Sequence, residues 1–127
     1  MEAHEKGRAR AAAPRPAARE LLLEAASAVM SERQTIDVPL SDIAARAEVN
    51  VALVSYYFGG KDGLLLALAK RDAAMALGEL DRLLSLNISP AEKLRRHLAG
   101  VIRTFFRYPY LYRLLAALMR DSSEENA

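Results

Sequence analysis

Apolar residues recur at three- and four-residue steps along most of this chain, and such spacing is typical of amphipathic helices. Nowhere does a run of strict alternation compete with it. The expected helices begin near residues 17, 39, 51, 61, 90 and 110. The longest is expected to run from residue 61 to about 86. The pattern therefore predicts an all-α fold.

Local signals mark where several of these helices begin. Pro39 suits a first helical position, because the N–H that it lacks is not needed there, although Ser41 could cap this helix instead. Asn50 is a good N-cap, since its side-chain oxygen can accept a hydrogen bond from a free backbone N–H. Residues 89–92, Ser-Pro-Ala-Glu, form a capping box with proline at the first helical position. A helix boundary is also expected at Gly59-Gly60.

Residues 39–65 place a short helix, a tight turn, a second short helix and a lysine in quick succession. This order is typical of a helix-turn-helix DNA-binding unit, whose second helix enters the major groove. The inward positions are expected to be Ile43, Ala44, Ala47, Val49, Val54, Tyr57 and Phe58. The outward positions of the second helix are expected to be Val51, Ala52, Leu53, Ser55 and Tyr56.

The following motifs occur here: Asp42-Ile43-Ala44, Ala47-x-Val49, Tyr56-Tyr57-Phe58 and Lys61-x-x-Leu64. With them, residues 16–76 resemble the DNA-binding domain of the TetR (tetracycline repressor)-type transcriptional regulators, with the helix-turn-helix at about 40–58. The resemblance implies a ligand-responsive repressor that binds a near-palindromic operator as a dimer. It also implies that residues 77–127 are the N-terminal part of a ligand-binding and dimerisation domain.

The same resemblance assigns contacts to the DNA. It implies phosphate contacts from Ser41, Tyr56, Tyr57 and Lys61, and hydroxyl and ammonium groups suit that task because they fix register without reading sequence. The expected base contacts are Val51, Ala52, Leu53, Ser55 and Tyr56. This set offers few hydrogen-bonding groups, so direct base readout should be modest. A partly buried Tyr57 and a solvated Lys61 are the alternatives.

Two positions depart from the family pattern. Glu48 stands where the turn usually has glycine, and a glutamate at positive φ would be strained by about 1 kcal/mol. Ser55 stands where many members have tyrosine. The first departure concerns the geometry of the turn, and the second concerns the base preference.

Composition excludes several functional classes. The chain of 127 residues has no cysteine, so disulfides and thiolate metal sites are excluded. His4 and His97 lie far apart in sequence, and no nucleophile with a base or pair of carboxylates emerges. We therefore expect no enzyme, no metal and no cofactor. A charged N-terminus and the lack of a long apolar run indicate a soluble, intracellular protein rather than a secreted or membrane protein. The resemblance to the TetR type further implies a cytoplasmic, nucleoid-associated bacterial protein.

Charge by itself does not predict DNA binding. The net charge is +2, and residues 21–70 carry four basic and six acidic groups. Residues 1–15 are expected to form a flexible basic arm, in which Arg8, Arg10 and Arg15, together with Arg19, could contact phosphates or the minor groove. A solvated tail is the alternative. The other class of protein that fits is a helical interaction or small-ligand-binding protein that no longer reads DNA.

The C-terminal half is where an effector pocket would begin. The candidate lining residues are Met75, Phe105, Phe106 and Tyr110, although aromatic residues at helical spacing are more often plain core. The buried face of the helix after residue 90 is expected to be Leu94, Leu98, Val101, Ile102 and Phe105. Residues 122–127 have the composition of another helix start, so we expect a shortened regulator or a piece of a longer chain.

Overall fold

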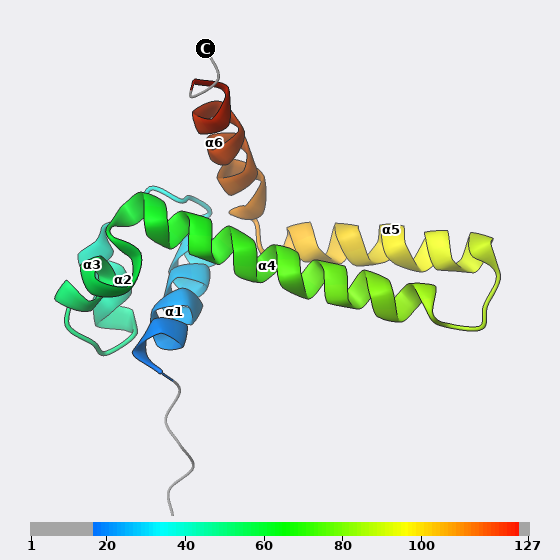
Figure 1. Ribbon diagram of the computed structural model, residues 1–127, viewed down its shortest axis with the longest axis horizontal. Coiled ribbons are helices and arrows are strands. Elements are labelled where there is room, and N and C mark those ends of the chain that lie inside the picture. Colours follow the sequence, from blue (N-terminus) through cyan, green and yellow to red (C-terminus); the bar gives the residue numbers. More distant parts are fainter. Residues whose placement is uncertain (1–16, 125–127) are drawn as a thin grey trace, which may run out of the picture.

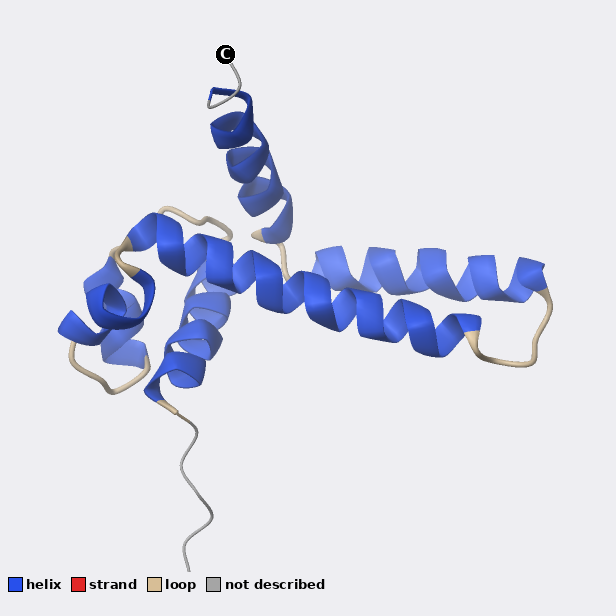
Figure 2. Ribbon diagram, viewed as in Figure 1, coloured by secondary structure: helices blue, strands red, loops and turns tan. Residues whose placement is uncertain are grey.

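The structure is a computed structural model that describes residues 17–124, and those residues fold into helices joined by short loops (Figure 2). In chain order the helices are α1 (Ala18–Arg33), α2 (Leu40–Arg46), α3 (Ala52–Phe58), α4 (Lys61–Leu84), α5 (Pro90–Arg107) and α6 (Leu111–Glu124). Each begins at the predicted residue or directly after it. Within the described range there is no strand, so the predicted all-α fold is confirmed.

The long helix α4 connects two parts of the molecule (Figure 1). Helices α1, α2 and α3 gather around its first half, and we call residues 18–68 the head. α5 runs back antiparallel along the second half of α4, and α6 leaves α4 at a steep angle near its middle. None of the helices in the described chain is both long and apolar enough to cross a lipid bilayer.

The head is organised around the predicted apolar stripe of α1. The stripe consists of Leu22, Ala25, Ala26, Val29 and Met30. All five are buried, and they pack against side chains from the α1–α2 loop, α2, α3 and α4. The buried apolar residues of the head are Leu22, Leu23, Ala25, Ala26, Val29, Met30, Val38, Ile43, Ala44, Val54, Leu64 and Leu68. Because each buried leucine-sized side chain contributes about 1.5–3 kcal/mol relative to exposure, this cluster holds the short helices α2 and α3 in place.

Two residues from outside the head complete its core. Tyr110 and Leu114 are both 0% exposed and belong to the same cluster as the α1 stripe. Tyr110 is the largest fully buried side chain among the described residues. It lies directly before α6, and Leu114 follows one helical turn later. The start of α6 is therefore packed into the head.

The predicted buried face of α5 is wrong for the chain as described. All its members are exposed, from 38% at Val101 to 59% at Leu94, and α5 has no buried residue. The helix itself begins as predicted, since the Ser89 hydroxyl accepts a hydrogen bond from the Glu92 N–H at 3.2 Å. α5 packs chiefly on α4, and one neighbouring helix cannot cover a stripe this wide.

Candidate DNA-binding site

The turn between α2 and α3 is closed by the backbone. The Val49 N–H donates to the Ala44 carbonyl at 3.1 Å, and the Glu48 N–H donates to the Ala45 carbonyl at 3.1 Å. Glu48 has a φ of 56°, which lies in the left-handed region. The positive φ on which the expected strain of Glu48 depends is therefore present, and the strain itself stays a prediction.

Relief of this strain is testable. We expect Glu48→Gly to stabilise the chain by about 0.5–1 kcal/mol, because glycine adopts positive φ without steric cost. Thermal unfolding followed by circular dichroism measures the change. Ala45→Gly, an exposed position inside α2, is the matched control and should destabilise by about 1 kcal/mol. Equal effects of the two glycines would contradict the prediction.

The start of each short helix differs slightly from the expectation. The Asn50 side-chain oxygen accepts from the Ala52 N–H at 2.9 Å, as predicted, but α3 begins at Ala52 rather than Val51. Pro39 precedes α2, and its carbonyl accepts from the Asp42 and Ile43 N–H groups. Ser41 makes no capping hydrogen bond and stays exposed, so its alternative role as a cap is wrong.

Two ion pairs fix α2 against the end of α1. The Arg46 guanidinium donates to both carboxylate oxygens of Glu32, at 2.8 and 3.2 Å, and Arg33 donates to Asp42 at 2.7 Å. The hydrogen bond from Arg46 lowers the pKa of Glu32. Both pairs are exposed to solvent, which weakens them, so they contribute little to stability.

α3 presents most of the expected residues to solvent. Val51, Ala52 and Ser55 are exposed, and Tyr56 is 79% exposed. Leu53 is only half-exposed, because it packs against the core of the head. The four exposed residues are spaced so that they lie on one side of the helix.

The inward position expected for Tyr57 is wrong. Its side chain is 39% exposed, and its ring meets the Tyr56 ring edge-on with centroids 5.0 Å apart. Val54 and Phe58, four residues apart, face the core as predicted. Two phenol groups therefore lie next to each other at the C-terminal end of the exposed α3 face, where hydroxyls can reach a phosphate.

Lys61 has a partner within the chain. Its ammonium group donates a hydrogen bond to the backbone carbonyl of Val38, in the loop that precedes α2. Partial burial lowers the pKa of Lys61, while the nearby carboxylates of Asp37 and Asp62 oppose that shift. The side chain thus joins the start of α4 to the α1–α2 loop. Its phosphate contact stays a prediction, and it requires that the hydrogen bond to Val38 be exchanged or shared.

The loop between α3 and α4 brings the two helices into direct contact. Gly59 ends α3 with a φ of 76°, and its N–H donates to the Ser55 carbonyl at 2.9 Å. On Gly63, in the first turn of α4, a β-carbon would lie 1.7 Å from the carbonyl oxygen of Phe58. Only a residue without a side chain allows α4 to start so close to the end of α3.

The structure bears on the predicted arm and the predicted effector pocket only in part. Arg8, Arg10 and Arg15 lie outside the described residues. Arg19 is part of α1, with its guanidinium 5.4 Å from the centre of the Phe58 ring, and its contact with DNA stays a prediction. The predicted pocket residues are not gathered in one place.

The four pocket candidates lie in different surroundings. Phe105 and Phe106 line a shallow apolar depression on α5, together with Val101 and Ile102. Met75 is 51% exposed elsewhere, on α4, and Tyr110 is buried in the core of the head. Within the described range no three acidic or histidine side chains could share a metal ion.

Family comparisons match both halves of the chain. Residues 22–68 match the family described as bacterial regulatory proteins, tetR family, and residues 87–127 match the family described as tetracyclin repressor-like, C-terminal domain. The first match covers the whole helix-turn-helix and most of the α1 helix that supports it. The second begins in the loop before α5.

Individual relatives agree with these matches. The HTH-type transcriptional regulator BetI of Brucella abortus (strain 2308) is 36% identical over 91 residues, which cover 72% of this chain and 44% of that protein. BetI of Rhizobium meliloti (strain 1021) is 34% identical over 92 residues, or 72% of this chain and 43% of the relative. The chain thus spans less than half the length of these curated relatives.

A solved structure shows the same fold. A TetR-like transcriptional regulator from Rhodococcus sp. RHA1 superimposes with a TM-score of 0.66 and 26% sequence identity, over 89% of this chain and 67% of that one. The matches identify a family of regulators rather than enzymes, as the sequence predicted. From the helix-turn-helix geometry and these likenesses together, the chain belongs to the TetR family of DNA-binding transcriptional regulators.

Proposed function

We propose that this chain is the DNA-reading part of a ligand-responsive repressor that acts in the cytoplasm as a dimer on a near-palindromic operator. The observation that carries the proposal is the exposed face of α3, where Ala52, Ser55 and Tyr56 point away from a well-packed head. An α-helix fits the major groove, and the head supports α3 without covering its exposed face. Its relatives are named as transcriptional regulators, which supports the same role.

The side chains on this face define how the DNA would be read. Val51 and Ala52 can contact thymine methyl groups, and Ser55 offers one hydroxyl to a base edge. Tyr56 and Tyr57 would hold the phosphate backbone at the end of the helix. Because one good bidentate contact gives about 1–3 kcal/mol of discrimination and this helix has no residue that makes one, a single head should be weakly selective. A second copy of the head on the other half-site would multiply that selectivity.

Substitution of Tyr56 tests this site. We expect Tyr56→Ala to weaken binding by about tenfold or more, because a hydrogen bond to a charged phosphate contributes about 1.5–3 kcal/mol. The probe is the duplex that the unsubstituted chain enriches from a random-sequence pool, and binding is followed by fluorescence anisotropy in a series of salt concentrations. The melting temperature should not change, since the side chain is 79% exposed.

Tyr112 offers a matched control for this experiment. It is 72% exposed on α6, away from α3 (Figure 1), so Tyr112→Ala should bind the same duplex as the unsubstituted chain does. Unchanged affinity in Tyr56→Ala would contradict the proposed contact. A chain that enriches no duplex at any salt concentration would contradict the proposed function.

A further inference from the structure

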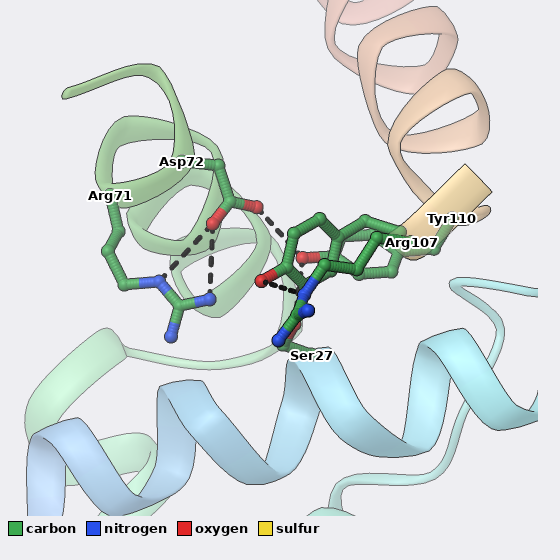
Figure 3. Close-up of polar contacts among 6 residues, drawn as sticks. Ser27, Arg71, Asp72, Arg107 and Tyr110 are labelled. Atoms are coloured by element: carbon green, nitrogen blue, oxygen red, sulfur yellow. Dashed lines mark hydrogen bonds and ion pairs between the residues drawn. The ribbon is translucent and has the colours of Figure 1, made fainter. Parts of the chain in front are cut away.

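A polar cluster lies where α1, α4 and the start of α6 meet (Figure 3). The Tyr110 hydroxyl is 3.0 Å from the Ser27 hydroxyl on α1 and 2.8 Å from a carboxylate oxygen of Asp72 on α4. The other carboxylate oxygen of Asp72 accepts from the Arg71 guanidinium at 3.1 and 3.3 Å. Residues separated by 83 and 38 positions in sequence thus share one phenol oxygen.

The direction of these hydrogen bonds follows from the number of protons. A phenol has one proton to donate, and an ionised carboxylate can only accept. Tyr110 therefore donates to Asp72, and its oxygen accepts the proton of Ser27. The hydrogen bonds therefore run from the Ser27 hydroxyl on α1 to the phenol, and from the phenol to the Asp72 carboxylate on α4. Because the phenol must accept from one group and donate to the other, its oxygen fits a single position between the two helices.

Burial makes this position costly to leave. Tyr110 is 0% exposed and Ser27 is 6% exposed. Among the buried residues of the described range, Ser27 is the one that is not hydrophobic. Burial also raises the pKa of Tyr110 well above its ordinary value, so the proton stays on the phenol. A tyrosine that left this site would give up both hydrogen bonds of its hydroxyl, and each buried group left without a partner costs about 1–3 kcal/mol.

We propose that Tyr110 is a positioning residue, whose hydroxyl fixes the direction in which α6 leaves the head by binding α1 and α4 at one point. Leu114, one turn further along, supplies a second buried contact of α6 with the same core. One contact directly before α6 and one in its first turn together restrict the direction of the helix axis. A phenylalanine would fill the same space but could slide or rotate between α1 and α4, because apolar contacts have no preferred direction.

The consequence for regulation rests on the proposed function. Helices that follow the head can alter its orientation only through elements that both parts share. Tyr110 is such an element, since it touches the supporting helix α1 of the head directly as well as α4. The fixed direction of α6 itself requires no DNA and no effector, so it can be tested separately.

The test measures the distance between the head and α6. Because the chain has no cysteine, the pair Ala45→Cys on α2 and Met119→Cys on α6 gives two unique sites for spin labels, both exposed. Double electron–electron resonance, with the labelled chain diluted in unlabelled chain, yields the distribution of distances between the two labels within one molecule. The unsubstituted background should show one narrow population.

Two variants remove the proposed link. In Tyr110→Phe the single population should be lost, and the distribution should broaden or gain a second population while the helical circular dichroism is retained. Ser27→Ala keeps the tyrosine ring and its bond to Asp72, so it folds even if Tyr110→Phe does not, and it should broaden the distribution to a smaller extent.

The control is Tyr108→Phe. Its hydroxyl accepts a hydrogen bond from the neighbouring Arg107 at 3.2 Å and joins no two helices, so this variant should keep the narrow population. A distribution in Ser27→Ala and in folded Tyr110→Phe that matches the unsubstituted one would overturn the proposal, as would equal broadening in Tyr108→Phe. Since DNA is absent throughout, these outcomes are independent of whether the chain binds an operator.

Discussion

Gly63→Ala is expected to destabilise the chain by about 3 kcal/mol, the upper range for an added group in a packed site. The new β-carbon would lie 1.7 Å from the Phe58 carbonyl oxygen, a backbone atom that no side-chain rotation can move aside. The start of α4 and the end of α3 must then separate, which displaces the exposed α3 face as well. Urea unfolding followed by circular dichroism measures the loss.

Gly78 provides the control in the same helix. A β-carbon there has no atom within 4 Å, so Gly78→Ala should stabilise the chain by up to about 1 kcal/mol, as alanine does in an exposed helix interior. The two identical substitutions are thus expected to differ in sign. Similar values for both would show that the contact between α3 and α4 is looser than the structure has it.

Leu114→Ala is expected to lower the free energy of unfolding by about 2–5 kcal/mol, the range for a leucine removed from a packed core. Leu114 is 0% exposed, and its partners lie in the core of the head. Because that core is shared, the head and α6 should unfold together in one transition. Thermal unfolding measures the loss of stability. Hydrogen exchange of the α1 amides shows whether that loss extends into the head.

The adjacent residue makes a sharp comparison. Leu115 is 48% exposed, so Leu115→Ala should change the free energy of unfolding by less than about 1 kcal/mol. A Leu114→Ala variant that speeds exchange in α6 but leaves α1 unchanged would contradict the shared core. The pair removes the same atoms from neighbouring positions, so composition and helix propensity cannot account for a difference between them.

The sequence predicted the head well because its signals are local. Asn50 and Ser89 act on N–H groups a few residues away, and the positive φ of Glu48 follows from the position of one turn. The stripe of α1 needs only helical spacing to be recognised. Such features depend on residues that are close together in the chain, so they can be predicted from the sequence.

The contacts that sequence reasoning missed join residues far apart. Nothing local distinguishes Ser27 or Asp72 from other polar residues on a helix, yet both bind Tyr110. The hydrogen bond from Lys61 to the Val38 carbonyl depends equally on how the chain folds back. Tyr110 was expected to line a pocket because an aromatic residue at helical spacing has no mark that tells a pocket from a core.

The wrong prediction that the apolar face of α5 is buried has a related cause. Spacing predicts that a helix has an apolar side, but it does not tell which element covers that side. The stripe from Leu94 to Phe105 is present as predicted and is exposed in the described chain. Hydrophobic pattern and burial are separate properties, and only the second depends on the partners.

The packing of Tyr110 and Leu114 into the head bears on how regulators of this kind can be recombined. A chimeric sensor cut at residue 76, the predicted end of the DNA-binding domain, would leave a cavity where these two side chains lie. Grafting this head onto a different sensory bundle therefore has to keep both side chains, or supply equivalents at the same depth. The functional module for such engineering is a discontinuous one, made of residues 18–68 and the first turns of α6.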